Sequence, residues 1–203
     1  MKKQFFVSIS MMDTNLTPIR YRKENRGEIL SGECHFPSLP MLEWSIIGDE
    51  DVEIIAVMTD DDNKNTAKNL MLFKEELKQV SAALGRELQV DREIVLPHRE
   101  DREKQVELFK TVCGAFEERA QIYMDITYGT KVTAVGLFSA LTYAEKVKHC
   151  DIRSIYYGKF SFGNKSIGDI YDVRSLYELS ALIHAADYLD SERISALIDE
   201  LWG

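Results

Sequence analysis

The sequence has few cysteines and no long hydrophobic run. Its three cysteines form no Cys-x-x-Cys pair, which excludes a disulfide framework and fits a reducing compartment. Its longest apolar stretches, such as residues 132–143, end well short of the roughly 18 to 20 residues that span a membrane. The N-terminal apolar segment is also too short for a signal peptide. We therefore expect a cytoplasmic protein with no membrane partner.

Basic charge is also scarce. The chain has 25 basic and 34 acidic residues, a formal net charge of −9. This balance argues against a protein that coats duplex nucleic acid or an anionic membrane through bulk charge. The acidity is concentrated in residues 49–120, where most acidic residues recur at helical spacing, as is typical of solvated helix faces. Any anionic ligand would therefore need a local site.

Two common site signatures are absent as well. No Gly-x-Gly-x-x-Gly fingerprint is present, which argues against a dehydrogenase with a dinucleotide cofactor. The four histidines are scattered along the chain, and no two have the helical spacing of metal ligands. We expect neither a metal nor a cofactor.

The patterns that are present predict an α/β protein. A chain of 203 residues, 45% of them hydrophobic, is long enough for one well-filled core, so we expect a single domain. Short apolar runs predict strands at residues 4–9, 52–58, 89–96, 122–126 and 152–157. Helical periods predict helices at residues 64–84, 102–118, 131–148, 175–189 and 191–201. This alternation predicts βαβ crossovers and a Rossmann-like, doubly wound, mainly parallel sheet.

Two stretches interrupt this alternation. Residues 11–44 carry several prolines and glycines without a helical period, so we interpret them as a long loop excursion with a possible hairpin around residues 25–27. After the last strand we expect a glycine-rich loop at residues 159–168 and an extended piece at residues 170–173. Because no linker precedes residue 191, the final helix is expected to pack on the same domain or at a dimer interface.

The most distinctive candidate site is the turn at residues 124–131. A strand ends in Asp125, Gly129 permits a tight turn, and a helix begins at Lys131. Ligands of open α/β sheets bind at the carboxyl ends of the strands. Backbone N–H groups at a helix N-terminus, with a threonine hydroxyl and a lysine ammonium nearby, make a plausible phosphate cradle. Taken alone the signal is weak, because Thr127 could equally serve only to cap the helix.

Five separated segments give this turn a context. In order they are Asp-Ile-Thr-Tyr-Gly-Thr-Lys (125–131), Leu-Phe-Ser-Ala-Leu-Thr-Tyr (137–143), Ile-Tyr-Tyr-Gly (155–158), Ile-Tyr-Asp-Val (170–173) and Leu-Ile-His-Ala-Ala-Asp-Tyr-Leu (182–189). Together they resemble the CRISPR-associated Rossmann-fold family, abbreviated CARF. The resemblance is close over residues 120–190 and loose from residue 4 onward. It implies a CARF-type ligand-binding domain over residues 1–190, followed by a short C-terminal helix at residues 191–203.

The resemblance also implies a ligand and a partner. CARF proteins are homodimers that bind a cyclic oligoadenylate, the second messenger of type III CRISPR antiviral defence, across their two-fold axis; here the ring would be cyclic tetra- or hexa-adenylate. The matching ligand contacts are Thr127, Gly129, Thr130 and Lys131. Ser8 and Ser10 occupy the place of the family's first motif, although members of the family usually have a glycine-rich segment there.

Two further residues complete the expected ligand-binding set. Asp125 is expected to organise the turn as a buried partner. Tyr128 could stack on an adenine or lie at an interface, since base stacking on an aromatic ring contributes about 1 to 3 kcal/mol.

Two functions remain open at this point. The first is a metal-independent ring nuclease, in which a ribose 2′-OH attacks the adjacent phosphate and leaves a 2′,3′-cyclic phosphate. Lys131, Thr127 and Ser10 would position the ring and stabilise the developing charge. The second is a binding-only sensor that regulates an effector domain or partner. A generic flavodoxin-like domain for another small molecule is a third, less specific interpretation.

Overall fold

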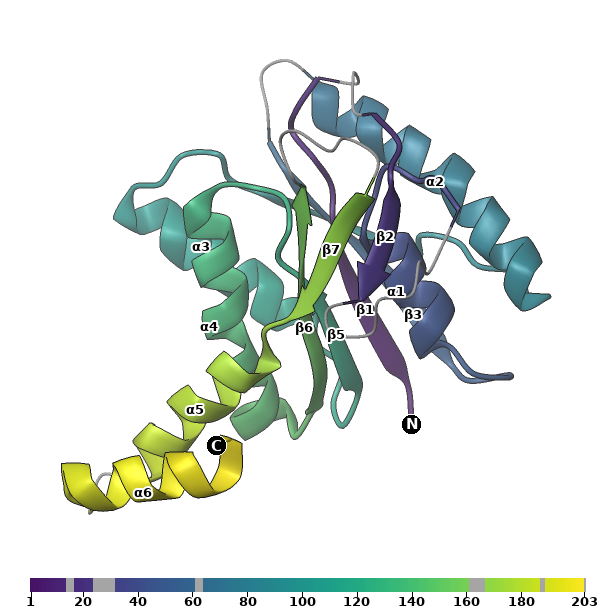
Figure 1. The fold of residues 1–203 in the computed structure, drawn as a ribbon. Helices are drawn as coiled ribbons and strands as arrows, with labels where there is room; N and C mark the ends of the chain where they lie inside the picture. Colours follow the sequence, from purple (N-terminus) through teal and green to yellow (C-terminus); the bar gives the residue numbers. More distant parts are fainter. Residues whose placement is uncertain (14–16, 24–31, 61–63, 161–166, 187–188, 203) are drawn as a thin grey trace.

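The computed structural model describes residues 1–13, 17–23, 32–60, 64–160, 167–186 and 189–202. They form a seven-stranded sheet in the order β2-β7-β6-β5-β1-β3-β4, flanked by six helices (Figure 1). The strands are β1 (Lys3–Ser8), β2 (Arg20–Lys23), β3 (Val52–Thr59), β4 (Arg92–Leu96), β5 (Gln121–Asp125), β6 (Asp151–Phe160) and β7 (Ile167–Asp172). The helices are α1 (Ser38–Ser45), α2 (Asn65–Leu84), α3 (Arg102–Ala115), α4 (Lys131–Lys148), α5 (Arg174–Ala185) and α6 (Ser191–Trp202).

Five adjacent strands, β6-β5-β1-β3-β4, are parallel, as the alternation of strands and helices predicts. β1 pairs with β3 and β5, β3 pairs with β4, and β5 pairs with β6, all in parallel. The α/β, mainly parallel architecture is therefore confirmed. At the other side of the sheet, the extended piece predicted at residues 170–173 is part of β7, which runs antiparallel to β6. β2 then pairs parallel with β7 and forms that edge of the sheet.

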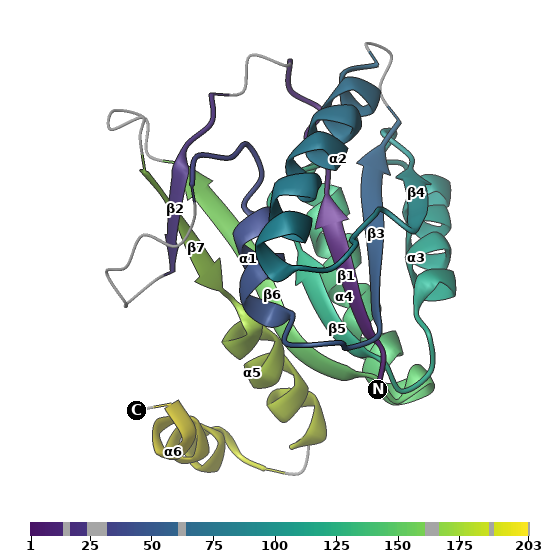
Figure 2. The same ribbon diagram turned by 90° about the vertical axis from the view of Figure 1, so that its right-hand side faces the viewer.

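Helices cover both faces of the sheet, so the core has two layers. Successive β1 side chains point to opposite faces: Phe5 joins a cluster with residues of α1 and α2, and Phe6 joins one with residues of α3, α4 and α5. Seen from the side in Figure 2, α1 and α2 lie on the near face of the sheet. This arrangement makes the sheet doubly wound and leaves the ends of the strands between the helix layers.

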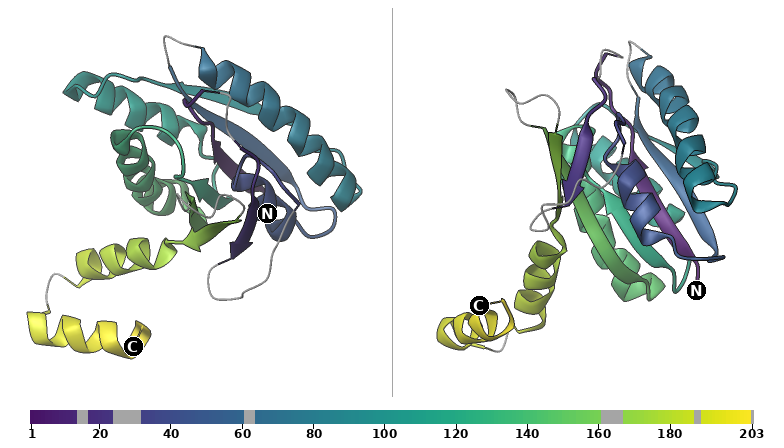
Figure 3. Two further views of the ribbon diagram at one scale, coloured as in Figure 1. Left: turned by 45° about the horizontal axis from the view of Figure 1, so that its top comes forward. Right: turned by 45° about the vertical axis from the view of Figure 1, so that its right-hand side comes forward.

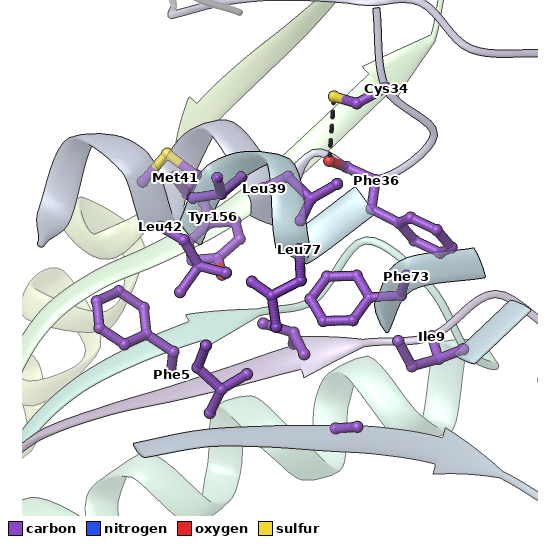
Figure 4. Packing of buried hydrophobic residues seen from close by; sticks show 14 of the residues in the cluster. Phe5, Ile9, Cys34, Phe36, Leu39, Met41, Leu42, Phe73, Leu77 and Tyr156 are labelled. Carbon is purple, nitrogen blue, oxygen red and sulfur yellow. Dashed lines mark hydrogen bonds between the residues drawn. The ribbon is translucent and has the colours of Figure 1, made fainter. Parts of the chain in front are cut away.

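The prediction that residues 11–44 lack helix is wrong. α1 lies at residues 38–45, with Pro37 at its N-cap and Pro40 in its first turn. Proline is tolerated there because the first N–H groups of a helix have no intrahelical partner. Leu39, Met41 and Leu42 of α1 pack into the first cluster (Figure 4), so tertiary burial stabilises a helix too short to show a period. The hairpin expected at residues 25–27 lies outside the described residues.

Several other boundaries shift. β4 begins at Arg92 instead of residue 89, and α3 ends at Ala115 instead of residue 118. α2 ends as expected at Gly85, whose φ of 63° is left-handed. Its N-cap is Lys64, whose side chain makes no cap hydrogen bond. β6 extends to residue 160, into the expected glycine-rich loop, most of which is not described.

α5 and α6 lie side by side and project from the body of the protein in both views of Figure 3. The first half of α5 packs on α4, where the Tyr177 ring meets Phe138 at a centroid distance of 5.8 Å. The Tyr177 hydroxyl donates to Glu145 Oε2 at 3.1 Å. No helix in the described part of the chain is long and apolar enough to cross a membrane.

Candidate functional site

The candidate site lies where the strand order reverses. β3 and β4 lie on one side of the central strand β1, and the chain then crosses to the other side of β1 with β5. β1 and β5 are neighbours in register, with Phe6 opposite Met124. Ligands of open α/β sheets bind outside the carboxyl ends of the strands at such a switch point. The two segments predicted from the sequence, at the ends of β1 and β5, therefore come together here.

Asp125, the last residue of β5, joins these two strand ends. Its side chain is fully buried. Its Oδ1 accepts a hydrogen bond from the Thr127 backbone N–H at 2.8 Å, and its Oδ2 accepts one from the Ser8 backbone N–H at 3.2 Å. Asp125 therefore holds the start of the turn against the end of β1, in the organising role expected from the sequence.

Ser8 and Tyr128 form a second connection across the same gap. The Ser8 hydroxyl accepts a hydrogen bond from the Tyr128 backbone N–H at 3.0 Å. The Tyr128 ring is buried against Phe36, and its hydroxyl donates to the His35 carbonyl oxygen at 3.1 Å. Both Ser8 and Tyr128 thus support the turn from within the protein, and in this conformation neither offers a face to a ligand.

Ser10 is also buried. Its hydroxyl accepts from the Met12 backbone N–H at 3.1 Å, and its carbonyl oxygen accepts from Asn69 Nδ2 at 2.8 Å. The same amide nitrogen donates to the Met12 carbonyl oxygen at 2.9 Å. Asn69 of α2 therefore shapes the chain after β1, a role that sequence reasoning missed because a lone asparagine inside a helix gives no local signal.

The exposed part of the site is the turn that leads into α4. Thr130 is the N-cap of α4, and its hydroxyl accepts from the Thr133 backbone N–H in a capping box. Gly129 has a φ of 105°, which glycine adopts without strain. The N–H groups of Gly129, Lys131 and Val132 have no hydrogen-bond partner among the described residues. Free N–H groups at a helix N-terminus are a favourable place for an anion.

Lys131 adds a positive charge at this helix end. It is exposed, and its ammonium forms no ion pair with any described residue. A cation in the first turn opposes the helix macrodipole, at a cost of about 0.3 to 1 kcal/mol. A bound anion would offset that cost.

Thr127 connects the turn to β6. Its Oγ1 accepts a hydrogen bond from the Gly158 backbone N–H at 2.9 Å, and the Thr127 side chain also hydrogen-bonds the Asp125 carboxyl group. Gly158 also lies against Pro37: a Cβ built on it would be 2.6 Å from the proline Cγ. The loop before α1 therefore packs directly beside the candidate site.

His35, in that loop, was not predicted as part of the site. Its Nδ1 lies 2.6 Å from Glu76 Oε1, and its backbone N–H donates to Glu76 Oε2 at 3.0 Å. Because the His35 carbonyl accepts from Tyr128, the pair links α2 to the turn. The acidic residues of this segment were expected on solvated helix faces. Glu76 differs from that expectation, because its side chain is only 12% exposed.

Burial dominates the titration of the groups beneath the turn. It raises the pKa of Asp125 to about 6, although the hydrogen bonds from Thr127 and Ser8 act in the opposite direction. Burial also raises the pKa values of Tyr21, Tyr128 and Tyr156, and the negative charge of Asp125 adds to the rise. The tyrosines therefore remain neutral, and the pKa of Asp125 lies close to neutral pH.

Comparison with models of known protein families and with curated proteins returns no match for this chain.

The described residues form no metal cluster, and the best-formed hollow lies away from the turn. No group of three or more His, Cys, Asp or Glu side chains within the described ranges could hold a metal ion. A hollow of about 730 Å³ lies along the C-terminal half of α2 and residues 85–90, and no residue of the turn lines it. Gly129 and Lys131 are exposed at this turn, which we call the shelf, and its free N–H groups and its cation have no partner among the described residues. Such a shelf suits an anionic group that is enclosed from the other side.

Proposed function

We propose that this protein binds a cyclic oligoadenylate across a homodimer, with the turn at residues 127–131 of each copy holding one side of the ring. The observation that carries the proposal is Lys131 beside the N–H groups at the N-terminus of α4, all of them without a partner among the described residues. The turn lies at the switch point of the sheet and is braced by Asp125 and Ser8. An anion of repeated phosphates matches this set of donors.

A two-fold dimer would enclose the residues of the shelf that are exposed in the single chain. In an isologous dimer each copy presents the same surface, so two shelves would face one ring and enclose it. Four or six equal phosphates arranged in a ring fit such a symmetric pair. Thr127, Gly129, Thr130 and Lys131 would contact the ligand, while Ser8, Ser10, Asp125 and Tyr128 would hold the turn in place. The biological setting that follows from the resemblance is type III CRISPR defence.

Binding is tested by calorimetric titration with cyclic tetra-adenylate and cyclic hexa-adenylate. We expect one of the two rings to bind with two protomers per ring. Lys131→Ala should weaken the affinity about tenfold or more, because each protomer loses a charge-assisted contact worth about 1.5 to 3 kcal/mol. Lys146→Ala is the matched control: Lys146 is an exposed lysine near the other end of α4, and its loss should leave binding unchanged. Absence of heat and of a thermal shift with either ring would refute the proposal.

Cleavage of the ring is the proposed activity, with the binding-only sensor as its alternative. Lys131 and the Thr127 hydroxyl face the phosphates in this proposal and would stabilise the charge that develops when a 2′-OH attacks. Ser10 would act on that chemistry only by supporting the chain after β1, because its side chain is buried. Incubation of the ring with the protein in EDTA, followed by chromatography, should yield linear products that end in a 2′,3′-cyclic phosphate. An intact ring after many hours would leave the sensor function.

A further inference from the structure

α6 carries an apolar stripe that its own chain covers only in part. Ile194, Leu197, Ile198 and Leu201 recur at i, i+3, i+4 and i+7, which places them on one face of the helix. The other residues of α6 up to Glu200 are polar or small. Leu201 is 55% exposed, and the other three side chains are half-buried.

The neighbouring helix shows the same incomplete burial. Leu176 and Ile183 of α5 are 59% and 49% exposed, and Tyr177 is the only fully buried side chain among the described residues of α5. The hydrogen bonds recorded for α6 within the described chain, such as Arg193 N to Asp190 Oδ1, are all local. The two helices therefore form a hairpin that contacts the body of the protein through the first half of α5.

The position of this hairpin separates it from the candidate site. The Arg174 guanidinium donates to the Arg153 carbonyl oxygen, so α5 starts beside the first half of β6. The hairpin then extends beyond the end of the sheet where β1 begins (Figure 1). The turn at residues 127–131 lies at the opposite end of the parallel strands, so the stripe on α6 is not part of the proposed ring site.

The charges beside the stripe favour a second copy of the same chain as its partner. At 100° per residue, Arg193 and Glu200 lie on the same flank of the α6 stripe. In an antiparallel pair the same flanks face each other, so Arg193 of one copy lies near Glu200 of the other. In a parallel two-fold pair the same flanks lie on opposite sides of the contact, so Arg193 and Glu200 would not meet across it. The stripe and its flank are thus complementary to themselves under a two-fold rotation.

We propose that α6 pairs antiparallel with α6 of a second copy, about a two-fold axis midway between Leu197 and Ile198. Two hairpins joined in this way form a four-helix arrangement, which is the usual way for amphipathic helix pairs to bury their apolar faces. This contact involves residues of α6 alone and does not depend on a bound ring. It adds a second point of contact to the proposed homodimer, at the end of the sheet away from the ring site.

Association is measured by sedimentation of the full chain without ligand over a range of concentrations. We expect a dimer that Leu201→Glu weakens at least tenfold, because a charge would be buried in the contact. Since Leu201 is already more than half exposed, this substitution should leave the fold intact. Ser195→Glu, on an exposed face of the same helix, is the matched control and should not change the association. Equal dissociation constants for Leu201→Glu and the wild type would overturn the proposal.

Cross-linking tests the direction of the pairing. With the axis between residues 197 and 198, the two copies of residue 198 differ by about 1.5 Å along the helix axis, and the two copies of residue 194 by about 10 Å. Oxidation should therefore link Ile198→Cys into a disulfide dimer and leave Ile194→Cys largely unlinked. The wild type, whose three cysteines are buried, is the background control. Equal linking of the two variants would mean a parallel pair and would overturn the arrangement.

A charge exchange gives a second, milder test. Arg193→Glu and Glu200→Arg should each weaken the dimer a few-fold, and the double variant should restore it. Additive losses in the double variant would contradict the antiparallel contact. Because these measurements use no ring, their failure leaves the ring-binding proposal to be judged by its own titration.

Discussion

Gly158→Ala is expected to destabilise the protein by about 2 to 3 kcal/mol, the usual cost of overfilling a packed interior. The added Cβ would lie 2.6 Å and 2.7 Å from Cγ and Cβ of Pro37. A proline ring is rigid, and Pro37 is the N-cap of the buried helix α1, so the strain cannot be relieved by rotation of a flexible side chain. β6 and the loop before α1 would have to separate.

Chemical denaturation of the purified variants measures this effect. Gly114→Ala is the matched control, because no atom lies within 4 Å of a Cβ at that position, which is inside α3. It should be neutral or stabilising by up to about 1 kcal/mol, since alanine favours a helix interior over glycine. The same strain should loosen the Thr127 contact, because Gly158 N–H donates to the Thr127 hydroxyl. A Gly158→Ala protein as stable as the wild type would show that the loop can move away without cost.

The free energy of unfolding should fall by roughly 2 kcal/mol on account of Asp125 as the pH rises from about 4 to about 7. Burial raises the pKa of this carboxyl group to about 6 in the folded protein, against about 3.9 in an unfolded chain. Between these values the folded state binds more protons than the unfolded state. Stability therefore decreases with rising pH across this window, the opposite of the usual salt-bridged carboxylate.

Asp125→Asn tests this assignment, because an amide does not titrate. The difference in unfolding free energy between wild type and variant should change by roughly 2 kcal/mol between pH 4 and pH 7. Asp101→Asn is the control: Asp101 caps α3 at an exposed position, and asparagine caps a helix about as well as aspartate. Parallel pH profiles for wild type and Asp125→Asn would place the titration on another group.

Local pattern was sufficient to predict the central part of the fold. The strands around β1, β3, β5 and β6 are short apolar runs, and α2, α3 and α4 are helices of 14 to 20 residues. Such elements can be predicted because burial of one face or both imposes a regular spacing of apolar residues on the sequence. α1 could not be predicted in this way, because a helix of eight residues with two prolines near its start is too short to show a helical spacing of apolar residues. The pairing of β2 with β7 also escaped prediction, because strand pairing joins residues that lie about 147 positions apart, as in Arg22 opposite Asp169.

The candidate turn was found in the sequence, but the role of each of its residues depends on tertiary contacts. Ser8, Ser10 and Tyr128 look like surface polar or aromatic groups in a motif, and the structure buries all three. Their hydrogen bonds connect β1, the turn and the loop before α1. Glu76 and His35 form a pair only because α2 and that loop pack together.

The sequence by itself determined the class of the fold, the location of the turn at residues 125–131 and the absence of bulk positive charge, since each of these is written in local composition and spacing. Tertiary structure decided which side chains of the turn face solvent and which support it. The physical reason is that a polar group has two ways to satisfy its hydrogen bonds, through solvent or through a distant part of the chain. That choice depends on packing between segments far apart in sequence, and Lys131 is left exposed while Asp125 titrates in the interior.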